Sequence, residues 1–204
     1  MMNFGGRFLA LGDSYTIGEG LDELERWPNN LTELLNQSGI SINELQIIAT
    51  TGWTTSELYE AIERENPQGE FDLVSLLIGV NNQYRGLSTS DYAEEFSELL
   101  SMSVKLAANI SSRVLVLSIP DWGMTPFAES KNREEISKAL DSFNQINKQV
   151  SLKQGVNYCD ITPISREKFS KEYLAEDKLH YSGKMYSIWA KMAFDMLMKA
   201  EVFK

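Results

Sequence analysis

The chain has 204 residues, of which 43% are hydrophobic and 24% are charged, proportions that are typical of a folded globular protein and not of a disordered one. The formal net charge of −10 argues against binding to nucleic acid or to anionic lipid, because both need a basic surface. With one cysteine and one histidine, the sequence offers neither an intrachain disulfide nor a recognisable Cys/His zinc cluster, so we expect no metal.

No apolar run approaches the roughly 20 residues that a helix needs to span a bilayer. The N-terminus carries one arginine and a short apolar run that leads straight into polar residues, which is not the layout of a cleavable signal. We therefore expect one domain over residues 1–204 and, if the N-terminus is complete, a cytoplasmic location.

The first predicted element is a buried strand over Phe8–Leu11. This apolar run is too short for a helix, and it ends in small and polar residues that turn the chain. The strand places Ser14 at the rim of a sheet, where a hydroxyl can cap a helix, bind a phosphate or act as a nucleophile. The surrounding residues lack the Gly-x-Ser-x-Gly pattern of ordinary α/β-hydrolases.

Helices and strands then alternate along the chain. Apolar spacing, caps and Gly or Pro stops predict helices over Pro28–Ser38, 54–66, Ser90–Ile110, Glu134–Lys153 and from Ser182 onward. Short apolar runs predict strands over Leu45–Ala49, Leu73–Ile78, Val114–Ile119 and Val156–Asp160. This order predicts an α/β fold with a mostly parallel five-stranded sheet in a three-layer α/β/α sandwich.

Two hydrogen-bond donors follow predicted strands. Gly52 comes after the second strand and Asn81 after the third, and open α/β sheets place their sites at the carboxyl ends of strands. Together with the amide of Ser14, the amide of Gly52 and the side chain of Asn81 are suited to hold an oxyanion. Taken singly, each residue fits a structural role better: Gly52 as a plain turn glycine, and Asn81 as a turn or helix-cap residue.

His180, the only histidine, lies three residues after Asp177. An imidazole that titrates near neutrality is the usual base for a serine nucleophile, and a carboxylate at this spacing can reach its other ring nitrogen. The alternative interpretation is that His180 caps the helix that begins near Ser182 and that Asp177 is a solvated surface acid.

These blocks, in this order, resemble those of the SGNH hydrolases, also called GDSL esterases and lipases. The four similar segments are Gly12–Tyr15, Gly52, Gly79–Asn82 and Asp177–His180. The resemblance implies the SGNH hydrolase fold, with a flavodoxin-like sheet, and no cofactor. It also implies that Ser14 is the nucleophile, His180 the base and Asp177 its orienting acid, with Ser14, Gly52 and Asn81 as oxyanion donors. The sequence departs from the family pattern at Tyr15, where leucine is often found, and at Asn82, where aspartate is usual.

The substrate is less well indicated. The aromatic loop after the fourth strand suggests that Trp122, Met124 and Phe127 form an acyl pocket, or that they pack the loop down. Arg85 either holds a negative group of the substrate or is a surface arginine. Relatives of this type act on short-chain aryl esters, acetylated sugars, lysophospholipids and thioesters, so lysophospholipase-like and acetylesterase-like activities both fit.

The leading hypothesis is a serine esterase that hydrolyses small-molecule carboxylic esters with short or medium acyl chains through an acyl-serine. The alternatives are an acyltransferase that uses the same intermediate, a non-catalytic sugar- or lipid-binding domain, and a flavodoxin-like nucleotide binder. The sequence does not indicate an oligomeric state.

Overall fold

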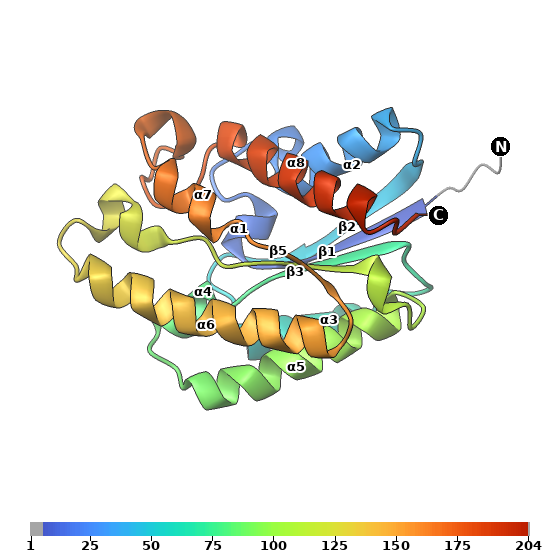
Figure 1. The fold of residues 1–204 in the computed structure, drawn as a ribbon, viewed down its shortest axis with the longest axis horizontal. Helices are drawn as coiled ribbons and strands as arrows, with labels where there is room; N and C mark the ends of the chain where they lie inside the picture. Colours follow the sequence, from blue (N-terminus) through green and yellow to red (C-terminus); the bar gives the residue numbers. More distant parts are fainter. Residues whose placement is uncertain (1–5, 204) are drawn as a thin grey trace.

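A computed structural model describes residues 6–203 of the chain, and in it five strands form one parallel sheet with the order β2-β1-β3-β4-β5 (Figure 1). The strands are β1 (Gly6–Gly12), β2 (Ile42–Ala49), β3 (Leu73–Leu77), β4 (Val114–Leu117) and β5 (Asn157–Cys159). The central strands β3 and β4 are buried along their whole length, as expected of strands that are covered on both faces. The predicted five-stranded parallel sheet is confirmed.

Helices cover both faces of the sheet (Figure 1). One face carries α2 (Trp27–Gln37) and α8 (Gly183–Lys199), and the other carries α3 (Thr55–Glu65), α5 (Thr89–Leu106) and α6 (Arg133–Lys153). The three-layer sandwich is therefore confirmed. Short helices α1 (Ser14–Ile17), α4 (Val80–Tyr84) and α7 (Thr162–Glu167) follow β1, β3 and β5. None of these three was among the helices predicted from the sequence.

The long helix predicted over Ser90–Ile110 ends earlier than expected. α5 stops at Leu106, because Ala108 and Asn109 adopt left-handed conformations with φ of 59° and 60° that reverse the chain. As a result Ile110, the last residue of the predicted helix, lies outside α5 and is 41% exposed. No glycine marks this turn in the sequence.

The last helix begins at Gly183 after Ser182, but the hydroxyl of Ser182 does not cap it. That hydroxyl donates instead to the carbonyl of Glu172 at 2.8 Å. The bond ties the start of α8 to the loop that leads to His180.

A capping box of Thr54 and Glu57 begins α3. The Thr54 amide donates to the Glu57 carboxylate at 2.7 Å, and the Glu57 amide donates to the Thr54 hydroxyl at 3.5 Å. These bonds fix the chain directly after Gly52.

Among residues 6–203, no helix combines the length and the apolar character that crossing a membrane requires. The prediction that the N-terminus is not a cleavable signal rests partly on residues 1–5, which lie outside the described residues.

Candidate active site

Ser14 stands at the point where β1 ends and the short helix α1 begins. The side chain of Asp13 caps α1 by accepting a hydrogen bond from the Tyr15 amide at 3.0 Å. Gly12 permits the close approach of β1 and β3 here, because a Cβ at this position would lie 2.5 Å from the Leu77 carbonyl oxygen. The chain therefore leaves the sheet at this point, and Ser14 becomes the first residue of α1. Its exposed fraction is 5%.

The four segments singled out in the sequence meet at one cavity of about 200 Å³ at the carboxyl ends of the strands. Ser14, Gly52, Asn81 and His180 all line it. The remaining walls are mainly apolar and aromatic, and consist of Tyr15, Thr51, Val80, Tyr84, Trp122, Phe127 and Leu179. A hydroxyl, an imidazole and two uncharged hydrogen-bond donors therefore face one small space.

Asp177 lies against the imidazole of His180. Its Oδ2 is 2.5 Å from the Nδ1 atom, and its Oδ1 accepts the amides of Leu179 and His180, each at 2.9 Å. The carboxylate is able to turn back in this way because Lys178 adopts a left-handed conformation with φ of 62°. An ionised Asp177 favours the tautomer with a proton on Nδ1, which leaves Nε2 as the acceptor.

The pKa of Asp177 is subject to opposing effects. Partial burial raises it, but the hydrogen bonds from the His180 ring and from two backbone amides outweigh burial and lower the pKa below its ordinary value. Asp177 is therefore a carboxylate at neutral pH.

Gly52 and Asn81 are held in place by bonds outside the cavity. Gly52 has a φ of 90°, and its carbonyl accepts a hydrogen bond from the Arg85 guanidinium at 2.6 Å. The Asn81 side-chain amide donates one hydrogen to the Trp53 carbonyl at 2.9 Å. An amide NH₂ group has two hydrogens, so a second one is left for another acceptor.

Asn82, where the family usually carries aspartate, is not among the residues that line the cavity and is 1% exposed. Its Oδ1 accepts the Thr55 amide at 3.1 Å, and its amide nitrogen donates to the Thr55 hydroxyl at 2.6 Å. That hydroxyl donates in turn to Glu95. Asn82 therefore joins α4 to the first turn of α3, and Glu95 supplies a carboxylate to the same network.

Two of the four candidate pocket residues line the cavity and two do not. Trp122 and Phe127 are among its walls, whereas Met124 and Arg85 are not. Arg85 pairs with Glu57 at 3.3 Å and supports Gly52 from outside. Tyr84 was missed. It lies three residues after Asn81 in α4, and recognising that short helix would have placed both on one face.

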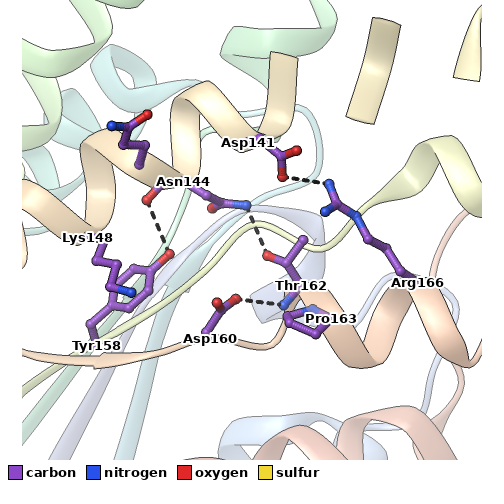
Figure 2. Close-up of a pocket in the computed structure, with 9 residues that line it drawn as sticks. Asp141, Asn144, Lys148, Tyr158, Asp160, Thr162, Pro163 and Arg166 are labelled. Atoms are coloured by element: carbon purple, nitrogen blue, oxygen red, sulfur yellow. Dashed lines mark hydrogen bonds and ion pairs between the residues drawn. The ribbon is translucent and has the colours of Figure 1, made fainter. Parts of the chain in front are cut away.

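A second cavity, of about 240 Å³, lies between α6, β5 and α7. Figure 2 shows its polar side chains bonded to one another: Asn144 donates to Thr162 at 3.0 Å, and Arg166 donates to Asp141 at 2.7 Å. Arg166 also donates to the buried Asp121 at 2.8 Å. Because Trp122 follows Asp121, this network anchors one wall of the first cavity.

Comparison with known proteins supplies a family match. The model of the GDSL-like lipase/acylhydrolase family matches residues 10–188. No curated protein matches the chain.

Several solved structures have the same fold. TesA aligns with a TM-score of 0.75 at 15% identity, over 95% of this chain and 99% of that one. The acetylxylan esterase Axe2 of Geobacillus stearothermophilus has a TM-score of 0.74 at 17% identity, over 95% and 94% of the two chains. The psychrotrophic esterase EstA from Pseudoalteromonas sp. has a TM-score of 0.73 at 17% identity, over 95% and 97%. At these identities the likeness establishes the fold.

Proposed function

Since the chain belongs to the GDSL-like lipase/acylhydrolase family, we propose that it is a serine esterase that hydrolyses carboxylic esters with short or medium acyl chains. The observation that carries this proposal is the convergence of Ser14, Gly52, Asn81 and an Asp177-bound His180 on one cavity. These are the groups that acyl transfer through a serine requires: a nucleophile, an oriented base and donors for an oxyanion.

In the proposed mechanism, the Oγ atom of Ser14 attacks the ester carbonyl while Nε2 of His180 takes its proton. Asp177 holds the ring and stabilises the imidazolium that forms. The backbone amides of Ser14 and Gly52 and the free hydrogen of the Asn81 amide donate to the oxyanion of the tetrahedral intermediate, and one such donor contributes about 10²–10³ in rate.

The intermediate collapses when the bond to the alcohol oxygen breaks, and His180 gives its proton to that oxygen. His180 then takes a proton from water, and the resulting hydroxide attacks the acyl-Ser14 carbonyl. Collapse of the second intermediate releases the acid and returns the proton to Ser14. Each step balances with the residues of this chain and one water molecule.

The aromatic walls of the cavity favour a substrate with an apolar substituent. The Trp122 ring lies 5.4 Å from that of Tyr84 and 6.0 Å from that of Phe127, centroid to centroid. The indole nitrogen of Trp122 donates to Gln83 at 2.9 Å, which fixes the ring. Tyr84 is 53% exposed and Phe127 41%, so aromatic surface is available at the mouth. We infer that this surface contacts the acyl or aryl group.

Two relatives suggest specific probes. Axe2 is described as an acetylxylan esterase, and EstA as inhibited by monoethylphosphonate. We propose that acetyl esters fit the small cavity of this chain and that its serine reacts with phosphonates.

The proposal is tested by measuring hydrolysis of p-nitrophenyl acetate, butyrate, octanoate and dodecanoate. We expect kcat/KM to be highest for the shorter esters, since the cavity is small, and Ser14→Ala to lower kcat by about 10⁴–10⁶. The rate should fall on the acid side as His180 becomes protonated. Product analysis with an added alcohol separates hydrolysis from acyl transfer. Absence of turnover on every ester would reject the proposal.

A further inference from the structure

Two side chains from different helices contact one buried hydroxyl group. Thr55 is the first residue of α3 and is fully buried. Asn82, in α4, places its amide nitrogen 2.6 Å from the hydroxyl oxygen of Thr55. Glu95, in α5, accepts the hydrogen bond that this hydroxyl donates. Three helices therefore meet at a single oxygen atom.

The directions of these hydrogen bonds follow from one backbone group. The amide of Thr55 can only donate, and its acceptor is Oδ1 of Asn82 at 3.1 Å. An asparagine that turns its oxygen to this amide turns its NH₂ group to the hydroxyl. The hydroxyl accepts there and gives its one hydrogen to Glu95, because an ionised carboxylate can only accept. The bonds therefore run from Asn82 through Thr55 to Glu95.

An aspartate at position 82, which is usual in the family, does not fit these bonds. One of its oxygens would accept the Thr55 amide as before, but the other would face the hydroxyl. One hydrogen would then have to serve two carboxylates, and the carboxylate left without it would lose its donor. Among residues 6–203 no lysine or arginine forms an ion pair with Glu95, so the second negative charge would not be neutralised.

The same contact lies next to the proposed oxyanion donors. Asn81 precedes Asn82 in α4 and donates to the carbonyl of Trp53 at 2.9 Å. The chain runs from Gly52 through Trp53 to Thr55, so two consecutive residues of α4 bind this one short segment. Because α4 has only five residues and no side-chain cap, its position depends on contacts of this kind.

We propose that Glu95 and Asn82 form a matched acid–amide pair, which through the Thr55 hydroxyl holds α4 and its oxyanion donor Asn81 against the start of α3. Glu95 is then a positioning residue, and Asn82 is an amide because position 95 is an acid. The catalytic consequence rests on the proposed esterase function, whereas the matching of the pair does not.

The proposal predicts that the acid and the amide can be exchanged only together. Asn82→Asp alone should raise the equilibrium constant for unfolding, measured in urea, by about tenfold or more. In Asn82→Asp/Glu95→Gln the bonds reverse, since the new glutamine donates to the hydroxyl and the hydroxyl donates to the new aspartate. We expect this double variant to unfold with a constant within about threefold of that of the wild type.

Two controls separate matching from total charge. Asn82→Asp/Glu94→Gln has the same net charge as the exchanged pair, but Glu94 is an exposed neighbour of Glu95 on α5. It should remain as unstable as Asn82→Asp. Glu95→Gln alone keeps an oxygen that accepts from the hydroxyl, so it should cost less stability than Asn82→Asp.

The kinetics of p-nitrophenyl acetate hydrolysis supply a readout of positioning. Folded Asn82→Asp should lose about tenfold in kcat, because a displaced oxyanion donor forfeits part of the 10²–10³ that it contributes. KM should stay within about twofold, since these donors act on the transition state. The exchanged pair should recover kcat, and Asn82→Asp/Glu94→Gln should not.

Each outcome decides the inference. It would be overturned by an Asn82→Asp that costs nothing, or that costs the same with Glu95 and with Glu95→Gln, by an exchanged pair that does not fold, or by rescue through Glu94→Gln. In an active esterase, wild-type kcat in folded but destabilised Asn82→Asp would also overturn it. Recovery of stability in the exchanged pair alone upholds the matched pair, including the case in which Asn82→Asp does not fold. It does so even if the wild type hydrolyses no ester, when it is the proposed function that has failed.

Discussion

Asp13 is a fully buried carboxyl directly before Ser14. Burial raises its pKa to about 7, although the backbone amides of Tyr15 and of Asp13 itself donate to it and act in the opposite direction. Its Oδ1 caps α1, while its Oδ2 has no hydrogen-bond partner among the described residues. In the unfolded chain an aspartate titrates near 4. Between about pH 4 and pH 7 the native state therefore binds more protons than the unfolded state does, and stability falls as the pH rises.

This pH dependence predicts the behaviour of Asp13→Asn. The asparagine keeps an oxygen to accept the Tyr15 amide but cannot ionise. We expect the variant to gain free energy of unfolding relative to the wild type, by on the order of 2–4 kcal/mol, as the pH rises from about 4 to 8. Urea unfolding at several pH values measures it, with the exposed Asp22→Asn as the control. Parallel curves for wild type and Asp13→Asn would contradict the prediction.

The loop that carries Trp122 is held at its base by a hydroxyl from α6 and a guanidinium from α7. The Asp121 carboxylate is fully buried, and accepts the Ser137 hydroxyl at 2.6 Å, the Arg166 guanidinium at 2.8 Å and the Gly123 amide at 2.9 Å. Arg166 also reaches the exposed Asp141 (Figure 2). Of the two ion pairs of Arg166, the one that ends on a buried carboxylate is expected to matter more for stability.

We therefore predict unequal effects of breaking the two ion pairs. Arg166→Gln leaves Asp121 buried without its cation and should lower the free energy of unfolding by about 2–4 kcal/mol. Asp141→Asn breaks a pair that is largely in water and should cost less than about 1 kcal/mol. Lys148→Gln, at a residue that lines the same second cavity, is the control. Urea denaturation compares the three, and equal effects of Arg166→Gln and Asp141→Asn would show that the network does not anchor the loop as described.

At the scale of the whole molecule, the sheet was predictable from sequence because its strands are short apolar runs that alternate with amphipathic helices. The same alternation placed Ser14, Gly52 and Asn81 at one edge, since parallel strands end together. That residues 1–204 form one domain stays a prediction.

The features that the sequence did not indicate are short helices and contacts between residues that lie far apart in the sequence. The helices α4 and α7 have five and six residues, too few for a periodic pattern, so Tyr84 was not assigned to the cavity. The part played by Asn82 became visible only through Thr55 and Glu95, from two other helices. Arg85 was predicted to face a substrate or solvent. Its hydrogen bond to the Gly52 carbonyl joins residues that are far apart in the sequence, so the sequence around Arg85 gives no sign of it.

The most direct test of the account is labelling with a fluorophosphonate, followed by peptide mass spectrometry. The account predicts an adduct on Ser14 in the wild type, no adduct in Ser14→Ala, and labelling slowed by about a thousandfold or more in His180→Ala, because the hydroxyl then lacks its base. Circular dichroism checks that both variants are folded. An adduct on another residue, or equal labelling of the wild type and His180→Ala, would contradict the central claim that Ser14 is a nucleophile activated by His180.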